Sequence, residues 1–155
     1  MLQIIMTEVD IELHLCFLKY QINPDITVKI DEKVFLSGNQ SQDKLVIKLR
    51  EVLDPGPHRL SICYHNMTKP SVDSGEMAVI IDRVCFQNVN HDFKDHSRYA
   101  PEYPTHWVDQ HTAQGKYLAS ELHSNYLGWN GVWFLDFHVP IYRWIHQQMN
   151  LGWLI

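Results

Sequence analysis

Residues 125–140 read Asn-Tyr-Leu-Gly-Trp-Asn-Gly-Val-Trp-Phe-Leu-Asp-Phe-His-Val-Pro, and this stretch decides the fold that we expect. Asn130 and Gly131 form the strongest short signal for a two-residue hairpin, because a type I′ turn needs positive φ at both central residues. Pro140 cannot donate a ladder hydrogen bond, so the second strand should end there. The stretch therefore predicts a C-terminal β-hairpin.

Side chains alternate between the two faces of a strand, which assigns each residue of 132–139 to one face. The first face is wholly apolar and should lie in the core: Trp133, Leu135, Phe137 and Val139. The second face suits a partly covered surface: Val132, Phe134, Asp136 and His138. A two-residue turn would also fix the register, with Leu127 opposite Phe134 and Tyr126 opposite Leu135.

Length and composition restrict the class of protein. With 155 residues, the chain is long enough for one domain with its own core, so a single domain over residues 1–155 is expected. The formal net charge of −5 argues against nucleic acid as a partner. No apolar run approaches the roughly 20 residues that span a bilayer, so no membrane partner is expected. Acidic residues at positions 8, 10 and 12 argue against a signal peptide.

Short alternating segments separated by turn residues recur along the rest of the chain. The clearest turn is Asp-Pro-Gly-Pro at residues 54–57. Further strands are predicted at residues 2–6, 13–20, 25–31, 34–36, 44–50, 58–66, 77–89 and 116–119. The alternation changes phase after residues 79–81, which predicts a β-bulge or a central strand. This spacing of strands and turns predicts an all-β fold, an antiparallel, jelly-roll-like β-sandwich.

The sequence period changes after Pro140. Apolar side chains then recur at the spacing of one helix face: Ile141, Trp144, Ile145 and Met149. Pro140 suits the first turn of a helix, and Asn150 and Gly152 suit its end. We therefore predict a short C-terminal helix, although Ile141, Arg143 and Ile145 also alternate as a strand would. No helix is predicted before Pro140, and residues 90–114 are predicted to be one long irregular loop.

The histidines and cysteines suggest little chemistry. Ligand types for zinc or iron concentrate in the predicted loop: His91, His96, His106 and His111, with Asp92, Asp95 and Asp109. No pair has the helical spacing of a known metal motif, so ordinary surface histidines are favoured over a metal-dependent enzyme. Cys16, Cys63 and Cys85 are predicted to be buried free thiols, since an odd count argues against a disulfide framework. No catalytic residue and no metal ligand is assigned.

Aromatic side chains are the best candidates for a binding surface. Residues 117–155 contain one basic residue, Arg143, and two acidic ones, Glu121 and Asp136, which is typical of a core or of an interface. We predict an interface with another protein, with packing within the chain and stacking on sugar rings as alternatives. The predicted interface residues are Tyr99, Tyr103, Trp107, Trp129, Trp144, Trp153, Leu154 and Ile155.

Residues 25–66 resemble small calcium-dependent carbohydrate-binding modules. The resemblance rests on the hairpin Ile-Thr-Val-Lys-Ile-Asp, a lysine-flanked strand and the run Asp-Pro-Gly-Pro-His-Arg-Leu-Ser-Ile. It implies a β-sandwich, and no set of calcium ligands from that family maps onto this sequence. The alternative function is accordingly a calcium-dependent module for host-surface glycans, with calcium as its cofactor.

Residues 126–155 resemble the C-termini of small proteins of tailed bacteriophages. The matching runs are Gly-Trp-Asn-Gly-Val-Trp, Pro-Ile-Tyr-Arg-Trp-Ile-His-Gln and Leu-Gly-Trp-Leu. The resemblance implies a virion component assembled in the host cytoplasm, in the tail, baseplate or capsid. The leading hypothesis is a non-enzymatic structural protein without cofactor. It would bind other virion proteins, as a homo-oligomer or in a hetero-assembly, through the aromatic loop and the hairpin and tail at residues 125–155.

Overall fold

The computed structural model describes residues 6–19, 22–66, 77–103, 105–115 and 120–148. One sheet contains β1 (Thr7–Leu18), β4 (Lys44–Leu53), β6 (Ala78–Phe86), β7 (Val89–His91) and β9 (Tyr126–Leu127). The other contains β2 (Asp25–Ile30), β3 (Lys33–Asn39), β5 (Gly56–Tyr64), β8 (Arg98–Pro101) and β10 (Gly131–Val139). The helices are α1 (Thr105–Ala113) and α2 (Ile141–Gln148).

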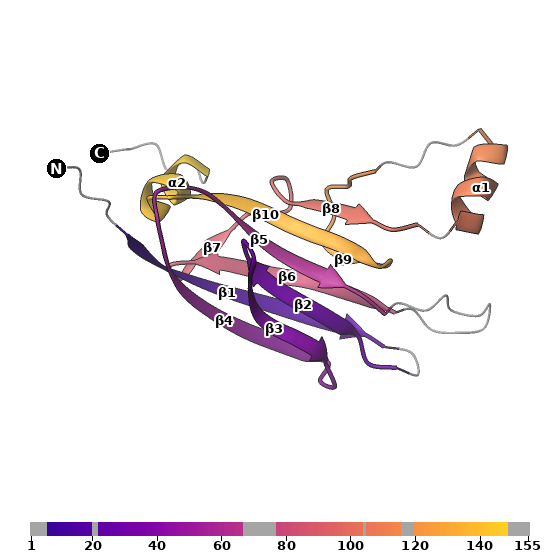
Figure 1. Ribbon diagram of the computed structural model, residues 1–155, viewed down its shortest axis with the longest axis horizontal. Helices are drawn as coiled ribbons and strands as arrows, with labels where there is room; N and C mark the ends of the chain where they lie inside the picture. Colours follow the sequence, from indigo (N-terminus) through magenta and orange to yellow (C-terminus); the bar gives the residue numbers. More distant parts are fainter. Residues whose placement is uncertain (1–5, 20–21, 67–76, 104, 116–119, 149–155) are drawn as a thin grey trace.

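The two sheets form an antiparallel sandwich (Figure 1). The first has the order β4-β1-β6-β7, with β9 also paired with β6, and the second has the order β3-β2-β5-β10-β8. Helix α2 follows β10 at one end of the sandwich, and α1 lies at the opposite end (Figure 1). The predicted all-β sandwich with a short C-terminal helix is confirmed. Neither described helix is long and apolar enough to cross a membrane.

Alternating apolar side chains of both sheets fill the space between them. Strand β1 contributes Val9, Ile11, Leu13, Leu15 and Phe17. Strand β10 contributes the four residues predicted for the core, all at most 3% exposed: Trp133, Leu135, Phe137 and Val139. Each fully buried side chain of this kind stabilises the fold by about 1.5–3 kcal/mol. The predicted assignment of the two faces of β10 is therefore confirmed.

The predicted Asn-Gly hairpin is wrong. Strand β10 pairs with β5 and β8 instead, and β9 pairs with β6 of the other sheet, where Leu127 lies opposite Val79. Gly131 has a φ of +149°, but Asn130 does not adopt a positive φ, so the turn is not type I′. Both edges of β10 are occupied by other strands, and Leu127 is fully buried in the first sheet. Tertiary burial thus overrides the local turn signal.

A two-residue turn with positive φ at both positions lies elsewhere, at Gln87 and Asn88, where φ is +51° and +63°. It joins β6 to β7, so the predicted strand at residues 77–89 is in fact two strands. The predicted bulge in this region is confirmed. The pairing of β1 with β6 shifts at Asp82, because His14 lies opposite Arg83 and Leu15 opposite Ile81.

The predicted irregular loop at residues 90–114 is also wrong in part, because it contains β8 and α1. Helix α1 lacks a regular apolar stripe, so its period could not be detected in the sequence. The predicted α2 is confirmed, with Ile141, Trp144 and Ile145 buried on one face. The strand predicted at residues 116–119 and the helix residue Met149 lie outside the described residues, as do residues 2–5 of the first predicted strand.

Gly131 is required by the close approach of β8. A Cβ atom at Gly131 would lie 2.3 Å from the backbone oxygen of Ala100. We predict that Gly131→Ala lowers the free energy of unfolding by about 1–3 kcal/mol, measured by chemical denaturation. Gly38→Ala is the matched control, since Gly38 also has a positive φ of +131° but has no atom within 4 Å of its Cβ position. Equal losses in the two variants would contradict the role given to this contact.

Candidate functional site

The bulge in β6 exposes two charged residues in succession. Strand side chains normally alternate between faces, but Asp82 and Arg83 are both exposed, while Ile81 and Val84 on either side are buried. Bulges are frequent beside functional sites because they change the direction of a side chain. Here the extra residue places a carboxylate and a guanidinium next to each other at the surface.

A cleft of about 350 Å³ lies beside this bulge. The lining residues come from β6, β7 and the segment after β7: Asp82, Arg83, Asn90, His91, Asp92, Phe93 and Lys94. His91 and Phe93 are buried, whereas the five other lining residues are exposed. The tight turn at residues 87–88 brings β7 back alongside β6, with Asn90 opposite Cys85. The cleft therefore has two buried rings and a rim of exposed polar side chains.

The charged groups of the cleft are not engaged with protein partners. Within the described part of the chain, no ion pair or side-chain hydrogen bond involves Asp82, Arg83, Asp92 or Lys94. Elsewhere comparable groups are paired: Arg50 binds Asp10 at 2.7 Å, and Lys33 binds Glu51 at 2.6 Å. Two carboxylates and two cations line the cleft, so its formal charge is balanced.

His91 packs between the cleft and helix α2. Its ring is 3% exposed and stacks on the Trp144 indole, with centroids 4.9 Å apart and planes 9° apart. Burial lowers the pKa of His91 to about 4, His96 acts in the same direction, and Gln148 and Asp92 oppose the shift. Gln148 approaches the ring without hydrogen-bond geometry, since neither ring nitrogen has a hydrogen-bond partner. At neutral pH the imidazole is uncharged, with one donor and one acceptor nitrogen.

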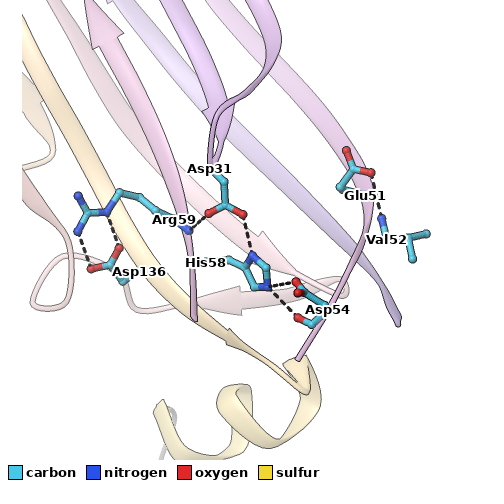
Figure 2. Close-up of polar contacts among 7 residues, drawn as sticks. All are labelled: Asp31, Glu51, Val52, Asp54, His58, Arg59 and Asp136. Carbon is cyan, nitrogen blue, oxygen red and sulfur yellow. Dashed lines mark hydrogen bonds and ion pairs between the residues drawn. The ribbon is translucent and has the colours of Figure 1, made fainter. Parts of the chain in front are cut away.

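A second polar cluster links three segments at one end of the sandwich (Figure 2). His58 donates from Nδ1 to an Asp31 carboxylate oxygen at 2.7 Å and from Nε2 to the Asp54 carbonyl oxygen at 2.8 Å. The backbone N–H of Arg59 donates to the other Asp31 oxygen at 2.8 Å. The Arg59 guanidinium makes two hydrogen bonds to Asp136 and lies 4.0 Å from the Phe134 ring centroid.

The contacts of His58 favour its charged form. Burial alone would lower the pKa of His58, but hydrogen bonds to Asp31 and Asp54, together with the negative charges of both carboxylates, raise it above the ordinary value. Both partner atoms are acceptors, so both ring nitrogens carry hydrogen. This cluster joins the turn between β2 and β3 to the turn between β4 and β5. With both nitrogens of His58 occupied, it is a structural cluster rather than a site for a ligand.

A metal site requires that several ligand side chains converge. Among the described residues, no three His, Cys, Asp or Glu side chains are grouped so that they could hold a metal ion. Of the histidines proposed as ligands, His91 is buried against Trp144, and the side chain of His106 is not described. Calcium needs roughly six to eight oxygen ligands. Because calcium also accepts backbone and amide oxygens, its binding stays a prediction of the resemblance, whereas no described cluster of side chains marks a transition-metal site.

The predicted interface residues have different environments. Tyr99 and Trp144 are buried, at 1% and 5% exposure, as the alternative of packing within the chain expects. The Tyr99 hydroxyl donates to the Trp129 carbonyl and accepts from its N–H at 3.0 Å. Tyr103 and Trp129 are half-buried and form an edge-on ring pair with centroids 6.3 Å apart. The remaining candidates fall on side chains that are not described: Trp107, Trp153, Leu154 and Ile155.

The interface role of Tyr103 and Trp129 stays a prediction, because no partner contact tests it. Sequence reasoning missed the cleft, although it considered His91 and Asp92 as candidate metal ligands before favouring ordinary surface histidines. The signal that pointed to the cleft was the phase change in residues 77–89, since a bulge exposes Asp82 and Arg83 together. What could not be read from the sequence is that β7 returns beside this bulge.

Comparison with known proteins shows the fold. No protein-family model matches the sequence, and no curated protein matches it. A selenomethionine form of vCBM60, from work on a circular permutation linking two families of calcium-dependent carbohydrate-binding modules, aligns with a TM-score of 0.50. This alignment covers 82% of this chain and 89% of the other, at 9% identity. vCBM60 in complex with galactobiose aligns with a TM-score of 0.49, covering 83% and 97% of the two chains at 8% identity.

The raised pKa of His58 predicts a loss of stability at alkaline pH. A raised folded-state pKa stabilises the fold fully below the unfolded value of 6.5, and the stabilisation disappears as pH rises through the folded-state pKa. We expect the melting temperature to fall above pH 6.5 in the wild type and to fall less in His58→Gln. His138→Gln, at an exposed histidine, is the control. An alkaline decline that is unchanged in His58→Gln would contradict the charged state of His58.

The lowered pKa of His91 predicts a loss of stability at acid pH. The unfolded chain takes up a proton below pH 6.5, whereas folded His91 stays neutral down to about pH 4, so stability falls over this interval. We expect His91→Phe, which keeps an aromatic ring against Trp144, to weaken this decline. Melting temperatures between pH 6.5 and about 5 test it, because most carboxylates remain ionised there. Parallel profiles of variant and wild type would show that His91 does not titrate as described.

Proposed function

We propose that this protein is a non-catalytic binding module that takes a neutral saccharide in the cleft beside the β6 bulge. The observation that carries the proposal is the set of unengaged polar groups around that cleft. They carry both signs of charge in equal number, so they suit a neutral ligand better than an ion.

The chemistry of the lining matches that of a sugar. Each hydroxyl group of a sugar can donate one hydrogen bond and accept others, so a binding site needs both kinds of partner. Asp82 and Asp92 would accept hydrogen bonds from hydroxyl groups. Arg83, Asn90 and Lys94 would donate to them. The volume of about 350 Å³ lies within the range of small-ligand sites.

The fold supports the same class of function by analogy alone. vCBM60 was described in work on calcium-dependent carbohydrate-binding modules. Its likeness to this chain is one of sandwich architecture, and a shared fold does not by itself imply a shared function. Among the described residues, no three His, Cys, Asp or Glu side chains are grouped as a metal site. In the binding that we propose, the side chains of the cleft contact the saccharide directly, without calcium between them.

The virion hypothesis stays a prediction of the sequence resemblance. The comparisons point to no bacteriophage protein, and they support a glycan partner better than a neighbouring virion protein. A place in a virion and assembly in a host cytoplasm are therefore not part of this proposal.

The proposal predicts that the wild-type protein binds neutral oligosaccharides on a glycan array and that EDTA does not abolish binding. Asp82→Asn and Asp92→Asn should each weaken binding of the best ligand, measured by calorimetry, by about 10-fold or more, because each removes a charge-assisted hydrogen bond. Asp43→Asn, at a carboxylate far along the chain from the cleft, is the control.

Three results would contradict this function. They are the absence of any saccharide ligand, wild-type affinity in both cleft variants, and loss of binding when calcium is removed. The melting temperature of each variant separates a loss of binding from a loss of folding. Both aspartates are exposed, so neither substitution should change stability by more than about 0.5 kcal/mol.

A further inference from the structure

A second pocket, of about 270 Å³, lies where β10 joins helix α2. Its lining shares no residue with the cleft beside the bulge: His138, Val139, Pro140, Arg143, Trp144 and Gln147. The function proposed above does not use this pocket. Its composition differs from that of the cleft, because it contains no carboxylate.

The orientation of α2 places two of these side chains together. Ile141, Trp144 and Ile145 are buried and fix the helix face that packs on the sandwich. Arg143 and Gln147 are exposed, and side chains four residues apart lie on the same helix face. His138 belongs to the outward face of β10 and is exposed as well. A guanidinium, an amide and an imidazole therefore surround one pocket.

All three groups can donate hydrogen bonds, and Arg143 has a free charge. Within the described residues, no ion pair or hydrogen bond involves the Arg143 side chain. The acidic residue of β10 nearest in sequence is Asp136, which already binds Arg59 at 2.7 Å and 3.1 Å. The pocket thus has an unneutralised cation although the chain has a net charge of −5. This arrangement favours an anion, and the planar guanidinium matches the two oxygens of a carboxylate.

The rest of the lining is apolar. Pro140 is exposed beside the donor groups, and Val139 and Trp144, at 3% and 5% exposure, complete the lining. Such a surface suits the C–H face of a ring, whereas a small free carboxylate would leave it uncovered. We propose that this pocket binds the carboxylate of an acidic sugar, a hexuronic acid, through Arg143, with Gln147 and His138 as further donors.

This site and the cleft can be tested separately. Glucuronate and glucose differ only at one carbon, which is a carboxylate in the first and an alcohol in the second. Acetate supplies a carboxylate without a ring. Titration of the isotope-labelled protein with each of the three compounds, followed by NMR, reports which residues respond. We expect glucuronate to shift the signals of residues 138–147 and to bind there at least 10-fold more tightly than glucose or acetate.

The decisive variant is Arg143→Gln, which keeps a hydrogen-bond donor but removes the charge. It should lower glucuronate affinity at residues 138–147 by 10-fold or more. Lys44→Gln, at an exposed cation on β4, is the matched charge control and should leave the affinity unchanged. Arg143 is exposed, so the variant should fold, and its melting temperature verifies this.

The inference is overturned if Arg143→Gln binds glucuronate as the wild type does, or if Lys44→Gln loses as much affinity. It is also overturned if acetate binds as tightly as glucuronate, because the ring would then contribute nothing. Asp82→Asn should not affect this pocket. Failure of the cleft to bind neutral sugars would contradict the proposed function and leave this inference standing.

Discussion

Strand β10 is the constraint on which the rest of the sandwich depends. It pairs along its whole length with β5 and over its first half with β8, and its inward row fills the core from Trp133 to Val139. Because both edges of β10 are occupied, the chain before it must go to the other sheet, where β9 pairs with β6. The end of β10 also sets the start of α2 and thus places the second pocket.

The sequence contained enough information to predict the faces of the strands but not all of their partners. Three features follow from the spacing of apolar residues along the chain and were therefore predictable. They are the buried and exposed faces of β10, the bulge near Asp82 and the apolar face of α2. The partner of β10 was not, because an Asn-Gly pair reports only a local preference, and burial of Leu127 against the first sheet outweighs it. Helix α1 was missed since its sequence has no regular apolar stripe.

The candidate site depends on contacts that no local pattern reports. Asp82 and Asn90 come together only because the turn at Gln87 and Asn88 folds β7 back along β6. Gln87 is not a residue type that signals positive φ, so the turn itself was hidden. The same histidine pattern that suggested a metal loop contains a buried ring, His91, whose environment excludes charge. Residue types alone could not distinguish a metal-binding histidine from a buried neutral one.

His58 and His91 show how two buried imidazoles are held in opposite charge states. Both side chains are buried, but His58 has acceptors on both nitrogens and is held in the charged form. His91 has no hydrogen-bond partner on either nitrogen and is held neutral by burial. Unsatisfied polar groups are costly in a protein interior unless something else satisfies them. Around His58 the protein supplies these hydrogen bonds, whereas the two buried nitrogens of His91 remain without them.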